Sequence, residues 1–345
     1  MEVEGYRIHA WGGELQWESF EVPDPGPGEV LVRVEACGIG LTVLNWIRGD
    51  LGNDPALLPR VPGHEIVGWV ETVGEGVLAP ATGDRVVGYV YLSCGYCQPC
   101  RSGQDSMCTN LGGYISVHCD GGYAPYVVLP ARNLLPLPTS IPAAQAVAIP
   151  DAIVSPLHMV RTRGQVGFGD RVAIIGAGGG LGLHMVQIAR LYAGEVAGLE
   201  ANEQKLAVVE EVGGMPVHSA PIDKVDAGAL WGGERPTVVI DLVGQPETLA
   251  WGFRALAPGG RMVLLTTFRD VDFAIDPREM VVRRLSILGS RYVCKSEIVE
   301  AAALVEAGHV RPVVTQVVPP EGVQEVHRAL QEGTLVGRGA LEWVN

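Results

Sequence analysis

The pattern of apolar and polar positions changes character near residue 150. Before that point the chain runs in short segments of alternating apolar and polar residues, as in residues 29–35, 66–73 and 85–90, and proline and glycine punctuate them. Such alternation places one face of a strand in a core and the other toward water. The first part of the chain is therefore predicted to be a small antiparallel β domain.

Beyond residue 170 the chain repeats a different unit, a short apolar strand followed by a turn and a helix. Residues 171–175 form a short apolar run, a glycine-rich turn follows, and residues 183–192 have helical periodicity. Further apolar strands are expected at residues 195–200, 237–242 and 261–266. Repeated alternation of strand and helix builds a doubly wound parallel sheet, so the chain is assigned to the α/β class.

The glycine-rich turn, residues 176–182, lies after a predicted strand and before a predicted helix. Backbone N–H groups of such a turn, together with the N-terminus of the helix, can hold a pyrophosphate. The candidate residues for this contact are Gly176, Gly179, Gly180, Leu181 and Gly182. The turn predicts a dinucleotide site.

Glu200 indicates which dinucleotide is used. It ends the next predicted strand, 18 residues after Gly182, where a carboxylate can accept hydrogen bonds from an adenosine ribose. A carboxylate repels a ribose 2′-phosphate, and neither Ala201 nor Asn202 supplies a cation to receive one. The expected cofactor is NAD.

Four cysteines lie close together in the first part of the chain, at spacings that suit one tetrahedral zinc. They are Cys94, Cys97, Cys100 and Cys108. Four protein ligands leave no open position, so this zinc is expected to be structural. Disulfides are the alternative, but residues three apart are strained partners, and the sequence shows no secretory signal.

Composition narrows the class of partner. A chain of 345 residues is expected to form two domains. The net charge of -14 and the absence of a basic run argue against nucleic acid. No apolar run of about 20 residues is evident, which argues against a membrane span. The expectation is a cytoplasmic enzyme acting on a small-molecule substrate.

A series of segments resembles the zinc-type medium-chain alcohol dehydrogenase family. These are residues 63–68 (GHEIVG), 82–86, the four-cysteine segment, 120–124, the glycine turn, 241–244, 258–261 and 336–338. The resemblance implies a GroES-like catalytic domain at 1–152 with a zinc lobe at 94–108, a Rossmann NAD-binding domain at 153–291, and a C-terminal return to the catalytic domain at 292–345. It also implies a homodimer or homotetramer and hydride transfer to or from nicotinamide. Arg338 is implied at the cofactor pyrophosphate, and Val243 and Thr266 are placed in the same cofactor site.

The sequence departs from that family at the catalytic metal. The family's first ligand is the second cysteine of a Cys-Gly-x-Cys segment, and here that position is Gly40. The usual acidic neighbour is replaced by Val43, and a histidine often used in proton relay by Asn45. Cys37 is a poor substitute, because three extended residues place it about 10 Å away on the other face of the strand.

Three residues that match the site remain, namely His64, Glu65 and Asp151. With a water they could still hold a catalytic zinc, since such sites need three protein ligands and one open position. The alternative is that His64 and Glu65 are a buried hydrogen-bonded pair that packs the domain. Both interpretations stay open from sequence alone.

Three functions follow from these observations. The first is an NAD-dependent alcohol dehydrogenase with a modified zinc site, in which Thr42, by resemblance, begins the proton relay. The second is a reductase of carbonyls or activated alkenes without catalytic zinc, in which Thr42, His64 or Tyr91 donates a hydrogen bond. The third is a non-catalytic NAD-binding protein. Trp46 is a candidate for the substrate pocket.

Overall fold

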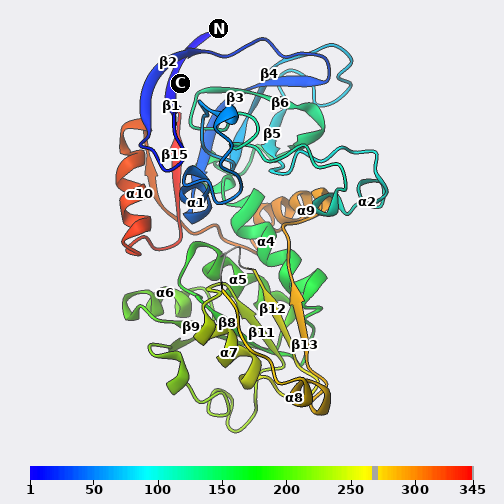
Figure 1. The fold of residues 1–345 in the computed structure, drawn as a ribbon, viewed down its shortest axis with the longest axis vertical. Helices are drawn as coiled ribbons and strands as arrows, with labels where there is room; N and C mark the ends of the chain where they lie inside the picture. Colours follow the sequence, from blue (N-terminus) through cyan, green and yellow to red (C-terminus); the bar gives the residue numbers. More distant parts are fainter. Residues whose placement is uncertain (266–270, 344–345) are drawn as a thin grey trace. The chain divides into compact units, whose positions relative to one another are not determined.

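The computed structural model describes residues 1–265 and 271–343. The chain divides into two compact units (Figure 1). The first comprises Met1–Asp151 and Val293–Asn345, and the second comprises Ala152–Tyr292. The C-terminal segment thus belongs to the same unit as the N-terminal part of the chain.

The first unit is built on a mainly antiparallel sheet. Its strands follow the order β14-β15-β3-β4-β5-β7, and β6 pairs with β3. Their bounds are β3 (Glu29–Ile39), β4 (Ile66–Val73), β5 (Arg85–Gly88), β6 (Tyr126–Pro130), β7 (Leu134–Pro136), β14 (Val314–Val318) and β15 (Arg338–Glu342). Strands β1 (Glu2–Arg7) and β2 (Gln16–Glu21) form a separate antiparallel pair. The predicted antiparallel β domain is confirmed.

Strand β3 organises the core of this unit, because it pairs with β4, β6 and β15. Val30, Val32 and Val34 lie in one apolar core, while Leu31 packs in another. Successive side chains of a strand point to opposite faces, so β3 supports both cores. The helices of this unit are α1 (Leu41–Ile47), α2 (Gln98–Arg101), α3 (Ala143–Ala146), α9 (Lys295–Glu306) and α10 (Val323–Gln331).

The second unit is a doubly wound parallel sheet, as predicted. Its strands follow the order β10-β9-β8-β11-β12-β13, and every described pair is parallel. The strands are β8 (Arg171–Ile175), β9 (Glu195–Glu200), β10 (Met215–His218), β11 (Val238–Asp241), β12 (Arg261–Leu264) and β13 (Ser286–Gly289). The helices are α4 (Val154–Leu157), α5 (Gly180–Tyr192), α6 (Leu206–Glu211), α7 (Pro246–Ala255) and α8 (Pro277–Val282).

The strand order of the second unit reverses between β8 and β11. Ligands of such sheets bind outside the carboxyl ends of the strands at this reversal. The glycine turn follows β8 directly, and residues 242–245 follow β11. The topology therefore places the predicted dinucleotide turn at the expected edge of the sheet.

One helical stretch, Ala143–Arg163, is long and apolar enough to cross a membrane by length and composition. Its most apolar window is 89% buried within the protein, which is typical of the core helix of a soluble protein. The expectation that no apolar run reaches this length was wrong. The run is accounted for by burial, because its side chains pack inside the protein rather than face outward.

Candidate active site

The glycine turn leads from β8 into α5. Gly176 has a φ of +83°, in the left-handed region that favours glycine. A Cβ on Gly182 would lie 2.2 Å from the carbonyl oxygen of Gly176, so a side chain there would separate the helix from the strand. The helix begins after Gly179 without a side-chain cap. Its first backbone N–H groups are therefore available to an anion.

Glu200 ends β9, and two backbone donors fix its carboxylate beside the turn. Oε2 accepts a hydrogen bond from the N–H of Gly178 at 2.8 Å, and Oε1 accepts one from the N–H of Asn202 at 3.0 Å. Val243, which follows β11, has its Cγ2 3.0 Å from the position of a Cβ on Gly176. The structure thus brings the glycine turn, Glu200 and Val243 together.

The structure does not test two other members of the predicted cofactor set. Thr266 lies outside the described residues. Arg338 is on β15 in the first unit, where its guanidinium is buried against Glu65. Its role at a pyrophosphate stays a prediction.

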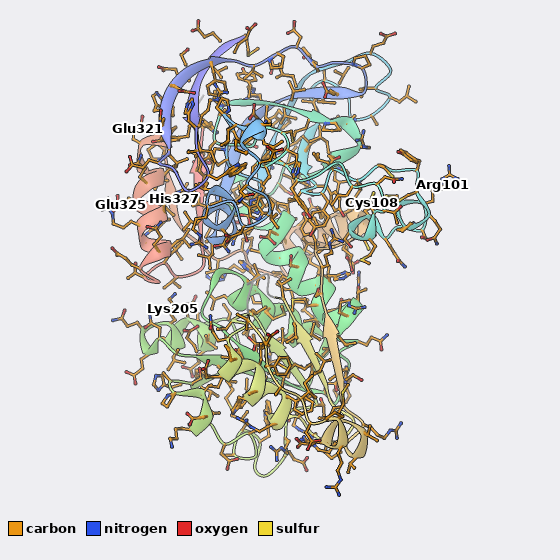
Figure 2. All side chains as sticks on the ribbon, viewed as in Figure 1. Arg101, Cys108, Lys205, Glu321, Glu325 and His327 are labelled. Carbon is orange, nitrogen blue, oxygen red and sulfur yellow. The ribbon has the colours of Figure 1, made fainter. Side chains whose placement is uncertain are left out.

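Lys205 is a cation beside the glycine turn that the sequence analysis missed. Its Cβ lies 2.7 Å from the position of a Cβ on Gly178 (Figure 2 labels Lys205). The side chain of Asn202 accepts a hydrogen bond from the N–H of Gln204 at 3.0 Å and so caps the helical turn Glu203–Lys205. Asn is a frequent N-cap, and this was the available signal that the chain turns back after Glu200.

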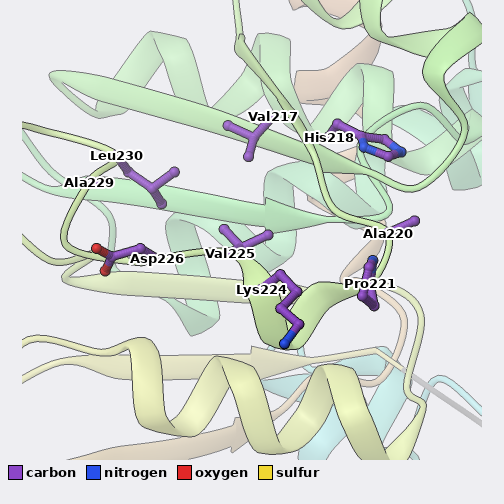
Figure 3. Close-up of a pocket in the computed structure, with 9 residues that line it drawn as sticks. All are labelled: Val217, His218, Ala220, Pro221, Lys224, Val225, Asp226, Ala229 and Leu230. Atoms are coloured by element: carbon purple, nitrogen blue, oxygen red, sulfur yellow. The ribbon is translucent and has the colours of Figure 1, made fainter.

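A hollow of about 380 Å³ lies in the second unit beyond β10 (Figure 3). It is lined by Val217, His218, Ala220, Pro221, Lys224, Val225, Asp226, Ala229 and Leu230. His218 is the register partner of Glu200, and its Nε2 lies 3.1 Å from the carbonyl oxygen of Ala201. The hollow therefore adjoins the strand end that carries Glu200.

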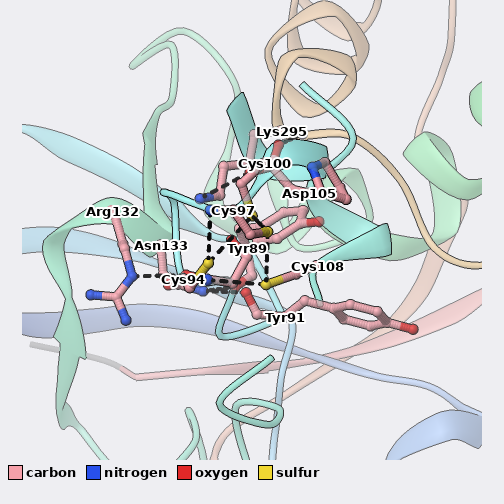
Figure 4. Close-up of polar contacts among 12 residues, drawn as sticks. Tyr89, Tyr91, Cys94, Cys97, Cys100, Asp105, Cys108, Arg132, Asn133 and Lys295 are labelled. Carbon is pink, nitrogen blue, oxygen red and sulfur yellow. Dashed lines mark hydrogen bonds and ion pairs between the residues drawn. The ribbon is translucent and has the colours of Figure 1, made fainter. Parts of the chain in front are cut away.

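The four cysteines of the lobe converge on one point (Figure 4). The Sγ of Cys97 lies 3.4 Å from that of Cys100 and 3.8 Å from that of Cys108, and the Sγ atoms of Cys94 and Cys100 are 4.0 Å apart. Four sulfurs about 2.3 Å from a central zinc would be separated by about 3.8 Å. The sulfur positions fit a tetrahedral zinc.

The surroundings of the sulfurs also suit a cation. The backbone N–H of Cys97 donates to the Sγ of Cys94 at 3.3 Å, and that of Cys94 donates to the Sγ of Cys108 at 3.3 Å. The backbone N–H of Cys100 is the main cause that lowers the pKa of Cys97 to about 5. Burial instead raises the pKa of Cys100 to about 12. A bound zinc would deprotonate the Cys100 thiol.

The second candidate metal group is His64, Glu65 and Asp151, whose donor atoms all lie within 4.8 Å of one another. The Nε2 of His64 lies 3.8 Å from Oε1 of Glu65 and 3.7 Å from Oδ2 of Asp151. Asp151 is supplied by the π-helical turn Ile149–Ile153, a form common at functional sites. Burial lowers the pKa of His64, although the neighbouring Asp151 acts to raise it.

Arg338 enters this group as a fourth member. Its guanidinium makes a close ion pair with Oε1 of Glu65, and Nη2 lies 3.7 Å from Oδ2 of Asp151. The side chain is only 4% exposed. Burial lowers its pKa to about 10, so it remains a cation at neutral pH. A Cβ on Gly40 would lie 2.0 Å from Nη1 of this guanidinium.

The residues present do not fit the catalytic zinc of the resembled family. The first ligand position, Gly40, has no donor, and the carboxylate of Glu65 already has a cation against it. Cys37 does not replace the missing thiolate, because its Sγ is buried on the side of Gly122 and Tyr123. Burial raises the pKa of that thiol, which keeps it neutral.

A chain of aromatic side chains, each in contact with the next, begins at His64. The ring of Trp46 lies 4.3 Å from that of His64 and 5.9 Å from that of Tyr114, and Tyr91 lies 4.9 Å from Tyr114. Thr42 is half-buried in the first turn of α1. The structure therefore places Trp46 beside His64.

Comparison with known proteins gives matches over both units. The alcohol dehydrogenase GroES-like domain matches residues 26–139, and the zinc-binding dehydrogenase family matches residues 180–307. An alcohol dehydrogenase of Geobacillus stearothermophilus is 32% identical over 336 residues, covering 95% of this chain and 96% of that protein. An acryloyl-coenzyme A reductase of Sulfurisphaera tokodaii is 28% identical over 343 residues, covering 95% and 96%. The crystal structure of an NAD-dependent alcohol dehydrogenase matches with a TM-score of 0.89 at 33% identity, covering 99% of this chain and 100% of that one.

Proposed function

Because the chain belongs to the zinc-type medium-chain alcohol dehydrogenase family, and is an oxidoreductase of that family, we propose that it is an NAD(H)-dependent reductase of an activated carbon–carbon double bond. The observation that carries this proposal is Gly40 at the position of the family's first metal ligand, in a chain that keeps an intact dinucleotide turn. The enzyme would keep hydride chemistry and work without the metal that polarises an alcohol.

The chemistry of a conjugated double bond suits such a site. NADH would supply a hydride, which adds to the β-carbon of an alkene conjugated with a carbonyl. The electron pair moves to the carbonyl oxygen as an enolate, and a proton then adds to the α-carbon. No alkoxide forms, so a Lewis acid is not required, and hydrogen-bond donors can stabilise the enolate. Among the described residues, Thr42 and Tyr91 are the proposed donors, because His64 is almost fully buried among Glu65, Asp151 and Arg338.

The relatives support this substrate class. One of them is named an acryloyl-coenzyme A reductase, and acryloyl thioesters contain such a conjugated double bond. We further propose that zinc binds at Cys94, Cys97, Cys100 and Cys108 and acts structurally, since four thiolates complete its tetrahedron. NAD is proposed over NADP because Glu200 is held at the ribose position by two backbone donors.

A second candidate is oxidation of an alcohol with a zinc held by His64, Glu65 and Asp151. The proximity of their donor atoms, all within 4.8 Å, favours it. This candidate requires Arg338 to leave Glu65 so that the carboxylate can bind metal.

The two candidates differ in their response to a chelator. Purified protein is assayed for NADH oxidation with acryloyl- and crotonyl-thioesters and for NAD reduction with a panel of alcohols, each before and after incubation with a zinc chelator. Thioester reduction that survives chelation is the expected result. Alcohol oxidation that chelation abolishes while the protein stays folded and keeps the zinc of the four cysteines would establish the second candidate instead. NADH binding without turnover of either class would indicate a non-catalytic protein.

A further inference from the structure

Gly40 and Arg338 are neighbours across two strands of the first unit. Strand β15 pairs antiparallel with β3, with Gly339 opposite Ile39 and Ala340 opposite Gly38. One further step along this register brings Arg338 opposite Gly40. The two residues are far apart in the chain, and the strand pairing alone places them together.

The backbone does not require glycine at position 40. Gly40 has a φ of -135° and a ψ of 175°, which is extended backbone that any residue adopts. The Arg338 guanidinium is what excludes a side chain, because a Cβ would lie 2.0 Å from Nη1 and 2.3 Å from Cζ. Real Cβ atoms do not approach other atoms so closely. The guanidinium is almost fully buried, so it cannot simply swing into solvent.

Gly38, near the end of β3 and two residues before Gly40, makes room for the partner of Arg338. A Cβ on Gly38 would lie 1.9 Å from Oε2 of Glu65. Residues two apart on a strand point to the same face, so Gly38 and Gly40 form one bare surface. The carboxylate lies over the first glycine and the guanidinium over the second. Gly38 belongs to the resembled family's motif, whereas Gly40 is the departure from it.

The charges explain why a cation is needed at this surface. Glu65 is fully buried, and neither of its carboxylate oxygens has a conventional hydrogen-bond partner within the described part of the chain. Asp151 adds a second carboxylate. Buried carboxylates are costly unless a positive charge lies beside them. Arg338 is the cation that the chain itself supplies here.

We propose that the Arg338 guanidinium is the permanent cation of the His64, Glu65 and Asp151 group, where it takes the volume of the missing first metal ligand, and that the loss of a side chain at Gly40 admits it. The group is then a closed ion-pair site and not an empty zinc site. This inference deepens the proposed function. Its tests use folding and metal content, so a failed activity assay and a failed inference are distinguishable.

The first test is a double-mutant cycle on the unfolding of the full-length protein in denaturant. Gly40→Ala is measured in the wild-type and in an Arg338→Ala background. We expect the alanine at 40 to lower the folding equilibrium constant at least about tenfold more when Arg338 is present. Gly52→Ala is the matched control, because a Cβ there meets no atom within 4 Å. An equal cost of Gly40→Ala in both backgrounds would overturn the inference.

The second test counts metal by elemental mass spectrometry after incubation with zinc and removal of the excess. We expect one zinc per chain, at the four cysteines, both in the wild-type protein and in His64→Ala. Two zincs in the wild type and one in His64→Ala would show that His64 holds a metal that the guanidinium was said to replace. This measurement uses only the wild-type protein and His64→Ala, so it remains valid even if a variant at Gly40 or Arg338 fails to fold.

Discussion

The N–H of Gly178 donates a hydrogen bond of 2.8 Å to Oε2 of Glu200. This contact ties the acidic end of β9 to the glycine turn after β8, and it fixes where the carboxylate stands. An adenosine ribose at the turn would meet an oriented pair of acceptors, and a ribose 2′-phosphate would meet negative charge.

Replacing Glu200 by alanine should therefore shift cofactor preference. We expect kcat/KM for NADH to fall about tenfold or more, and the ratio of NADPH to NADH efficiency to rise, because the carboxylate no longer binds the ribose or repels phosphate. The measurement is steady-state reduction with each cofactor. Glu203→Gln serves as the control, since that carboxylate is 78% exposed. An unchanged NADPH to NADH ratio in Glu200→Ala would refute the assigned role.

Lys205 should determine how much NADPH efficiency the Glu200→Ala variant gains. Its Cβ packs beside Gly178, so we expect its ammonium to reach a 2′-phosphate once the carboxylate is gone. We expect Glu200→Ala with Lys205→Ala to lose the NADPH efficiency gained by Glu200→Ala alone, by about fivefold to tenfold. Lys224→Ala is the control, because it is a lysine of the same unit that lines the hollow beyond β10. Equal NADPH efficiency in the single and double variants would count against Lys205.

The four-cysteine lobe should depend on zinc for its stability. Cys97→Ser removes one of the four sulfurs, and we expect the zinc content to fall from one to near zero and the melting temperature to drop by several degrees. Tyr96→Ala is the control within the lobe, because Tyr96 is 63% exposed. Retention of full zinc content in Cys97→Ser would place the metal elsewhere.

His327 should make the first unit sensitive to acid. It lies on α10 (Figure 2), its Nε2 is 2.9 Å from the hydroxyl of Tyr123, and burial lowers its pKa to about 4. The unfolded state has the ordinary pKa of about 6.5 and so binds a proton first. Stability is therefore full above about pH 6.5 and falls as the pH drops toward 4, by at most about 3 kcal/mol for this group.

His327→Gln should flatten that part of the dependence. The free energy of unfolding in urea, measured at several values between pH 7 and pH 4, checks this. His9→Gln is the control, because that side chain is 41% exposed. A wild-type protein whose stability is constant from pH 7 to pH 4 would contradict the assignment.

Strongly periodic segments of the fold were predictable from the sequence. The predicted strands at 66–73 and 171–175 coincide with β4 and β8, because apolar alternation or a short apolar run ends there at glycine or proline turns. The strand expected at 261–266 is described only as Arg261–Leu264. The family and the fold class followed from ordered motifs, and the comparisons confirm both.

The arrangement of the candidate site was harder to predict from the sequence. That Gly40 lacks a metal ligand is visible in the sequence, but what fills its place is not. The register between β3 and β15 brings Arg338 there, and no local pattern encodes a register between distant strands. Lys205 was missed for a related reason, because the turn capped by Asn202 returns the chain to the glycines.

An arginine side chain is present in every molecule of the protein, whereas a metal ion must be bound from solution. On the proposed assignment, the charge beside Glu65 arrives when β15 pairs with β3, and no metal ion has to be delivered to it or can be stripped from it. The cysteine lobe would still depend on a supply of zinc. Scarcity of zinc in the cell would then shorten the lifetime of the folded protein while leaving the turnover of each intact molecule unchanged.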